Sequence, residues 1–181
     1  ATDIYWHGSK SDYVPTEEEY LQMCANKSGS LTGMAAQLGA LLGWGTVAQI
    51  EALGRFAEAA GAAFQIKDDI LNIEGAAGIG KEFGDDVSEG KRTLMVIHAF
   101  NTASEADRQR LLGILKMHTK DSKLVAEAVE ILRKNSSIEY AMAVATSLLE
   151  AAWKEADIVL PESEAKNQLR KFSQMLISRA V

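Results

Sequence analysis

Apolar and polar positions recur with helical spacing along almost the whole chain. Ala, Leu, Glu, Lys and Met dominate long segments, and the strict apolar–polar alternation of β-strands is almost absent. Only Pro15 and Pro161 interrupt these segments. The pattern predicts an all-α helical bundle. Its helices are expected over residues 16–27, 31–42, 47–73, 90–101, 104–117, from 121 or 122 to 134, from 136 or 137 to 160, and over 163–179.

Capping and breaking residues set several boundaries. Thr16 with Glu19 three residues later forms a capping-box pattern, which predicts a helix start. Ser28-Gly29-Ser30 is predicted to break the first helix, and 43–46 is predicted to be a turn. Residues 75–90 contain five glycines and many polar residues, so they are predicted to form a loop, and a long ordered loop in a compact domain is often functional.

Composition narrows the class of protein. A chain of 181 residues fits one domain, 1–181. The net charge of -6 and the lack of a Lys/Arg block argue against a nucleic-acid partner. The single cysteine, Cys24, excludes an internal disulfide and suits a reducing compartment. No apolar run approaches the ~20 residues that span a bilayer, and no signal-peptide pattern is present. We expect a cytoplasmic protein that is not an integral membrane protein.

The segment around Asp68 and Asp69 carries the first candidate chemistry. Asn72 follows them at helical spacing, so the three side chains can share one helix face. Burying two adjacent carboxylates without a partner is costly. Mg²⁺, bound by one or two carboxylates and by substrate phosphates, would supply the missing charge. A solvated pair on a polar helix face is the alternative, and for two bare aspartates it is the better interpretation.

Three lysines flank the aspartate pair and change that balance. Lys27 precedes it, Lys81 lies in the glycine-rich loop, and Lys91 opens the next predicted helix. Lysines bind phosphate as point charges. Taken alone, Lys27 is better explained as a lysine that satisfies helix C-terminal carbonyls. The ordered set of acids and lysines predicts a diphosphate–Mg²⁺ site more strongly than any single spacing does.

The same segments resemble a known family. Phe64-Gln65-x-x-Asp68-Asp69-x-x-Asn72 is similar to the second aspartate-rich motif of the trans-isoprenyl diphosphate synthases, particularly the geranylgeranyl and farnesyl diphosphate synthases. The last position is Asn here, where Asp is also common. Further similar segments are Asp3-Ile4-Tyr5-Trp6, Pro15-Thr16-Glu17-Glu18-x-Tyr20, Asn26-Lys27-Ser28-Gly29, Gly80-Lys81-x-x-Gly84-x-Asp86 and Gly90-Lys91-x-Thr93-Leu94. The resemblance implies the C-terminal part of the isoprenoid synthase fold.

The resemblance also implies roles for these residues. Asp68 and Asp69 would ligate Mg²⁺ that holds an allylic diphosphate, with Asn72 in a weaker supporting role. The diphosphate would be contacted by Lys27, Lys81 and Lys91. Gln65 and the hydroxyl of Ser28, which replaces the usual Thr, would assist the developing allylic cation and the proton loss. The implied reaction condenses the allylic diphosphate with isopentenyl diphosphate to give a longer trans-prenyl diphosphate.

The resemblance is incomplete, and this leaves several hypotheses open. The family's first aspartate-rich motif and its isopentenyl diphosphate site belong upstream of residue 1, and the abrupt start looks like the tail of a helix. We therefore expect about half of an active site, which needs an N-terminal half present as a separate chain or a missing segment, in a homo- or hetero-oligomer. A non-catalytic regulatory subunit is the second hypothesis. A cyclising terpene synthase is a more distant third.

Overall fold

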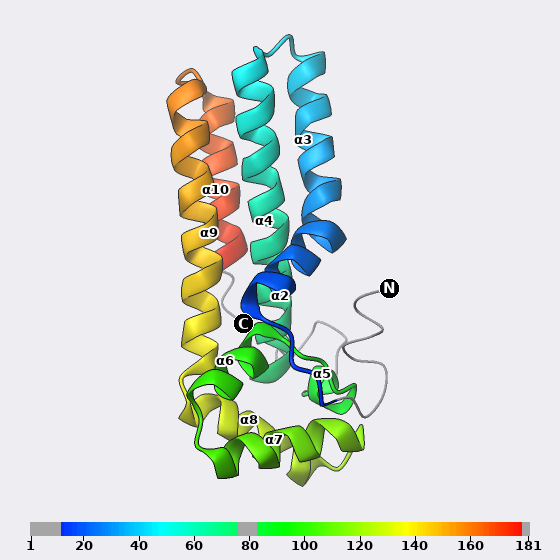
Figure 1. The fold of residues 1–181 in the computed structure, drawn as a ribbon. Helices are drawn as coiled ribbons and strands as arrows, with labels where there is room; N and C mark the ends of the chain where they lie inside the picture. The colour runs from blue at the N-terminus through cyan, green and yellow to red at the C-terminus, as the bar shows by residue number, and fades with distance from the viewer. Residues whose placement is uncertain (1–11, 76–82, 179–181) are drawn as a thin grey trace. The chain divides into compact units, whose positions relative to one another are not determined.

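The computed structural model describes residues 12–75 and 83–178, which form helices and connecting loops without a strand (Figure 1). The predicted all-α class is therefore confirmed. None of the helices in these ranges is both long enough and apolar enough to cross a membrane. The elements are α2 (Glu17–Cys24), the π-helix η1 (Ala25–Gly29), α3 (Ser30–Leu42), α4 (Val47–Glu74), α5 (Asp85–Ser88), α6 (Leu94–Thr102), α7 (Glu105–Met117), α8 (Ser122–Lys134), α9 (Ser137–Val159) and α10 (Glu164–Ser178).

The predicted helix starts agree with the capping contacts. At the start of α2, the Glu19 backbone N–H donates to Thr16 Oγ1 at 3.2 Å, and the Thr16 N–H donates to Glu19 Oε2 at 2.8 Å. This reciprocal pair is the capping box that the sequence predicts. At α7, the side chain of Ser104 accepts from the Asp107 N–H in the same manner.

The predicted break at 28–30 is wrong. The chain stays helical there as the π-helix η1, in which the Ser30 N–H donates to the Ala25 carbonyl, and α3 follows directly. Two hydroxyls lie against carbonyls in this widened turn: Ser30 Oγ donates to Asn26 O at 2.8 Å, and Thr32 Oγ1 lies 2.9 Å from Gly29 O. The small polar residues thus support a helical distortion, and π turns of this kind are frequent at functional sites.

The prediction that 75–90 is entirely loop is also wrong. Within it, residues 85–88 form the one-turn helix α5. Gly84 precedes this turn with φ 73°, a left-handed conformation that favours glycine, and a Cβ there would lie 2.2 Å from Val125 Cγ1. Residues 76–82, which include Lys81, and residues 1–11, which include the expected helix tail, lie outside the described residues.

The chain divides into two compact units, and α4 and α9 contribute to both. The residues of unit 1 that the structure describes are 12–23, 68–75 and 83–141. In it, α7 packs on α8, and α5 and α6 each contact α8. Its interior includes a buried run on α6 and the inner face of α8: Leu94, Met95, Val96, Ile97, Val125, Ala128, Val129 and Leu132. The prediction of a single domain over 1–181 stays a prediction.

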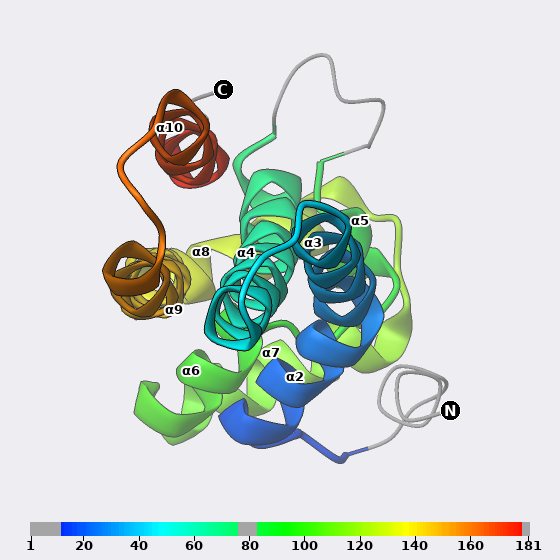
Figure 2. The ribbon, with the colours of Figure 1, turned by 90° about the horizontal axis from the view of Figure 1, so that it is seen from above.

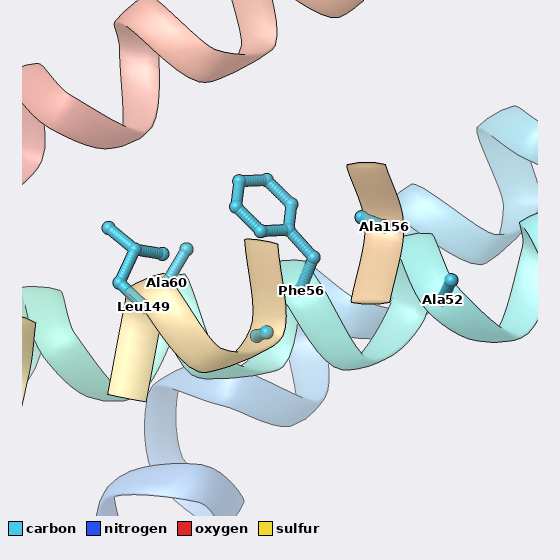
Figure 3. Packing of buried hydrophobic residues seen from close by; sticks show 6 residues of the cluster. Ala52, Phe56, Ala60, Leu149 and Ala156 are labelled. Carbon is cyan, nitrogen blue, oxygen red and sulfur yellow. The ribbon is translucent and has the colours of Figure 1, made fainter. Parts of the chain in front are cut away.

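The residues of unit 2 that the structure describes are 24–67 and 142–178. Within this unit, α3 lies on one side of α4, while α9 and α10 lie on the other (Figures 1 and 2). Phe56 of α4 packs edge-on against Trp153 of α9 with ring centroids 5.3 Å apart. Figure 3 shows the buried cluster around this contact: Ala52, Phe56, Ala60, Leu149, Ala152 and Ala156.

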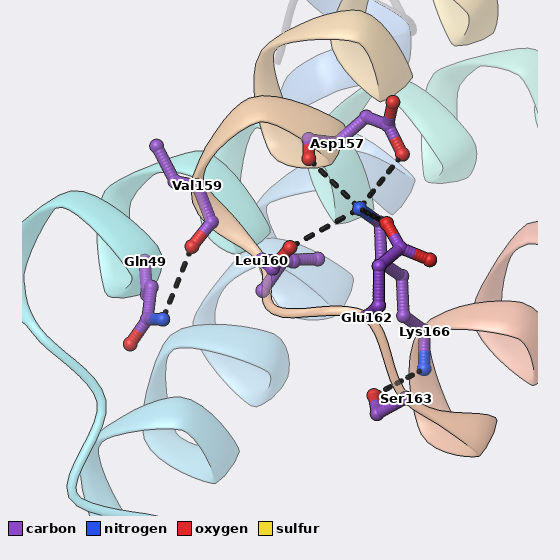
Figure 4. A network of polar contacts seen from close by, with 7 residues as sticks. All are labelled: Gln49, Asp157, Val159, Leu160, Glu162, Ser163 and Lys166. Atoms are coloured by element: carbon purple, nitrogen blue, oxygen red, sulfur yellow. Dashed lines mark hydrogen bonds and ion pairs between the residues drawn. The ribbon is translucent and has the colours of Figure 1, made fainter.

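A buried lysine fixes the connection from α9 to α10 (Figure 4). Lys166 Nζ donates to the Asp157 and Leu160 carbonyls at 2.9 and 3.1 Å. It also pairs with the Glu162 carboxylate at 2.7 Å. Gln49 Nε2 of α4 donates to the Val159 carbonyl at 3.1 Å. The last carbonyls of α9 therefore have donors from side chains, as buried helix ends require.

Candidate diphosphate and metal site

The aspartate pair lies on α4, as the sequence predicts, but its two members differ. Asp69 is only 7% exposed, whereas Asp68 is partly exposed. Asp69 Oδ2 accepts a hydrogen bond of 2.7 Å from the hydroxyl of Tyr20, which is itself buried on α2. A buried carboxylate needs such donors. The bond fixes the orientation of Asp69 within unit 1, and a phenol brings no positive charge of its own.

Asn72, one turn after Asp69, joins α4 to α5. Its Oδ1 accepts the Asp86 backbone N–H at 3.0 Å, and its carbonyl accepts the Gly84 N–H at 3.0 Å. Its Nδ2 is buried and has no hydrogen-bond partner. The amide oxygen thus positions the turn that follows the glycine-rich segment. The supporting metal role expected for Asn72 stays a prediction.

Lys91 lies at the end of this connection. Its Nζ contacts Asp86 Oδ1 at 2.6 Å and Glu89 Oε2 at 2.9 Å. Burial disfavours the charged form of Lys91, but hydrogen bonds to these two carboxylates outweigh it and raise the pKa above the ordinary value. Lys91 is therefore a fixed cation. We call Tyr20, Asp69, Asn72, Asp86 and Lys91 the unit 1 polar cluster.

A second group lies within unit 2, where η1 meets α4. Ser28 Oγ donates to Gln65 Oε1 at 3.3 Å, so the structure brings these two predicted residues together. The helices approach closely because two glycines meet: a Cβ on Gly61 would lie 2.8 Å from Gly29 Cα. Lys27 precedes Ser28 on η1 and is exposed. The π turn therefore carries two of the predicted site residues.

The predicted site residues thus fall into two groups, connected by the continuous helix α4. Sequence reasoning did not single out Tyr20 and Asp86, which contact the predicted site residues Asp69 and Asn72. Both lie in segments that resemble the family, and this is the signal that could have identified them. Lys81 lies outside the described residues.

The donors on α4 suit Mg²⁺ in a particular way. Among the residues that the structure describes, no three His, Cys, Asp or Glu side chains converge on one point. Asp68 and Asp69 nevertheless provide hard carboxylate oxygens. Mg²⁺ is usually held by one or two carboxylates, with substrate phosphates and water completing its octahedron, rather than by an all-protein cage. The residues present fit that arrangement.

Comparison with known proteins identifies the class. Residues 1–132 match the family model for polyprenyl synthetase. The chain belongs to the polyprenyl synthetase family, so the predicted resemblance to the isoprenyl diphosphate synthases is confirmed. A short chain isoprenyl diphosphate synthase from Methanothermobacter thermautotrophicus is 42% identical over 91% of this chain and 50% of the relative. A geranylgeranyl pyrophosphate synthase from Geoglobus acetivorans is 35% identical over 90% of this chain and 49% of the relative.

Solved structures agree on the fold. The geranylgeranyl pyrophosphate synthetase from Pyrococcus horikoshii superposes with a TM-score of 0.86 and 32% identity, over 98% of this chain and 53% of that one. The predicted all-α isoprenoid synthase fold is therefore confirmed. The chain spans about half the length of the curated relatives it matches.

Proposed function

We propose that this chain supplies the allylic-diphosphate-binding part of a trans-prenyl diphosphate synthase of the geranylgeranyl or farnesyl type. The observation that carries the proposal is the buried Asp69 carboxylate, oriented on α4 by the hydroxyl of Tyr20 at 2.7 Å. Membership of the polyprenyl synthetase family supports it. A buried carboxylate is costly in a purely structural helix, so the presence of Asp69 beside Asp68 favours a functional role.

In the proposed reaction, the C–O bond of the allylic diphosphate breaks and negative charge develops on the departing diphosphate. Lys27, Lys81 and Lys91 bind its oxygens. The ammonium of Lys91 carries three N–H donors. Its contacts with Asp86 and Glu89 use two, which leaves a third for a phosphate oxygen. Asp68 and Asp69 would hold Mg²⁺, and the bound metal would supply positive charge against the diphosphate.

The second step of the proposed reaction forms the new carbon–carbon bond. The double bond of isopentenyl diphosphate attacks the allylic cation, and a proton is then lost to give the longer trans-prenyl diphosphate. The oxygens of Gln65 and Ser28, 3.3 Å apart, provide partial negative charge for the cationic stage. The apolar residues of α4 exclude water, which would otherwise capture the cation.

The proposal assigns this chain about half of the active site. The other half, with the isopentenyl diphosphate site, would come from an N-terminal half of the synthase, in a homo- or hetero-oligomer. The match to only about half of each relative supports this division. Neither half is expected to catalyse prenyl transfer alone.

The test measures incorporation of labelled isopentenyl diphosphate into prenyl products. The chain is assayed alone and after co-expression with the unmatched half of the Methanothermobacter thermautotrophicus relative. We expect activity only in the complex, and Asp68→Ala with Asp69→Ala should lower it by ~100-fold or more. Glu130→Ala, at an exposed position on α8, is the control and should change nothing.

Two outcomes would contradict the proposal. Unchanged turnover of the double variant, with altered product length, would indicate a regulatory subunit instead. Full activity from the isolated chain would show that no other half is needed.

A further inference from the structure

Helix α3 has an unusual distribution of side chains. No residue of Ser30–Leu42 carries a charge. Its large apolar residues point to solvent, and their exposed fractions decide the argument: Leu31 65%, Met34 60%, Leu38 53%, Leu41 60% and Leu42 72%. The spacing of these five residues places them on one stripe of the helix. We call this stripe the α3 apolar face.

The opposite side of α3 carries small residues and packs on α4. A Cβ added to Gly33 would lie 3.2 Å from the Gly54 carbonyl, and Thr32 Oγ1 donates to the Ala57 carbonyl at 2.8 Å. The helix therefore buries a glycine while it exposes leucine and methionine. Folding driven by apolar burial would give the reverse arrangement if α4 were the only partner of α3.

The position of α3 within unit 2 is consistent with a second partner. It lies on one side of α4, whereas α9 and α10 lie on the other side (Figure 2). Soluble monomers rarely expose contiguous apolar patches of this kind, and such patches mark interaction surfaces. A helix without charges is suited to being covered on both sides.

We propose that the α3 apolar face is the docking surface for the N-terminal half of the synthase, as a helical segment with a complementary uncharged stripe. This inference rests on the proposed function. The chain matches the Pyrococcus horikoshii structure over 98% of its own length but covers only 53% of that protein. A protein of this fold therefore has nearly as much chain again, which needs a surface to pack on.

The location of the face also suits that occupant. Helix α3 continues directly from η1, which carries Lys27 and Ser28. A segment seated on α3 would therefore lie beside two residues of the candidate site. An occupant placed there can contribute the missing side chains of the site, which a remote partner could not do.

The test compares variants of the full chain, each co-expressed with the unmatched half of the Methanothermobacter thermautotrophicus relative. Leu38→Lys with Leu41→Lys places two charges on the face and should weaken the complex at least 100-fold, measured by titration and native mass. Ile158→Lys is the matched control, because Ile158 is also an exposed apolar residue of unit 2, on α9. It should bind like the unmodified chain. Circular dichroism checks that each isolated variant folds.

A labelling measurement tests the same surface without adding charge. Cys24 is fully buried, so the unmodified chain should react slowly with a maleimide. Leu38→Cys should react quickly in the isolated chain and at least tenfold more slowly in the complex. Ile158→Cys should react at the same rate in both.

The outcomes separate the docking surface from the proposed function. Binding that survives the two lysines, or equal labelling of Leu38→Cys in both states, overturns the docking surface even if the complex transfers prenyl groups. A dimer of this chain that Leu38→Lys disrupts also overturns it, because a second copy would then cover the face. A complex that needs the face but transfers no prenyl group overturns the function alone.

Discussion

The contact between Tyr20 and Asp69 allows a prediction about a single atom. Tyr20→Phe removes one donor from a buried carboxylate and changes little else, so it should lower the free energy of unfolding by about 1–3 kcal/mol. Urea unfolding measures this. Tyr13→Phe is the matched control: the Tyr13 hydroxyl also bonds a carboxylate, Glu19, but at an exposed position, so its loss should cost about 0.5 kcal/mol or less. Equal effects of the two changes would show that Tyr20 does not hold Asp69.

A second residue, His98, gives a prediction about pH. Burial lowers its pKa from the ordinary value of 6.5, although the Glu17 carboxylate opposes the shift. Its Nδ1 lies 3.1 Å from Ser137 Oγ, and its ring stacks on Tyr140 with centroids 4.1 Å apart. The unfolded chain therefore binds a proton more readily than the folded chain. Stability should fall as the pH falls through 6.5 toward the folded-state pKa.

Urea unfolding at pH values from about 8 to 5 checks this prediction about His98. His98→Gln keeps a polar side chain but does not titrate there, so the slope of stability against pH should be smaller in the variant. The same slope in both proteins would mean that other groups cause the pH dependence.

At the scale of the elements, the helix types and most boundaries were predictable because they depend on local signals. Thr16 and Ser104 cap helices through residues three positions away. The π turn and α5 were not predictable, because distant contacts stabilise them. Gly29 packs against Glu58 of α4, and Asn72 of α4 receives the Asp86 N–H. From local propensity alone, the π turn was predicted to be a helix break, and α5 was predicted to be part of a loop.

The candidate site shows the same limit. Helical spacing correctly placed Asp68, Asp69 and Asn72 on α4. Helical spacing could not distinguish the environments of these three side chains, because the environments depend on partner residues in other elements. Tyr20 lies 49 residues from Asp69 in the sequence, and Asp86 lies 14 residues from Asn72. Sequence spacing therefore predicts which groups are available, whereas the fold determines which of them are oriented.

The close approach of η1 and α4 can be tested with two glycines. A Cβ on Gly61 would lie 2.6 Å from Thr32 Oγ1 and 2.9 Å from the Ser28 carbonyl, whereas a Cβ on Gly39 meets nothing within 4 Å. Gly61→Ala should therefore destabilise the protein by about 1–3 kcal/mol through overpacking. Gly39→Ala should be neutral or stabilise by up to ~1 kcal/mol, because alanine favours a helix. Thermal unfolding compares the two, and a neutral Gly61→Ala would contradict the close packing.

At the scale of the whole molecule, the set of donor groups that the described residues provide has a chemical consequence. The described part of the chain offers two neighbouring carboxylates and the fixed cation Lys91 but no converging set of three acidic, histidine or cysteine ligands. We expect such a donor set to bind a metal–diphosphate complex better than either component alone. Affinity for one ligand should therefore depend on the presence of the other.

Thermal unfolding with Mg²⁺, inorganic pyrophosphate or both tests that dependence. Mg²⁺ alone should shift the midpoint little, and the two together should shift it by more than the sum of the separate shifts, since ligand at 100 times its Kd adds about 2.7 kcal/mol to stability. Chelation of the metal should remove the gain. Asp68→Ala with Asp69→Ala should abolish it, whereas Glu130→Ala should leave it intact, because Glu130 lies exposed on α8. Full stabilisation by Mg²⁺ alone would instead require a metal site built by the protein itself, and the assignment of the diphosphate to this chain would fail.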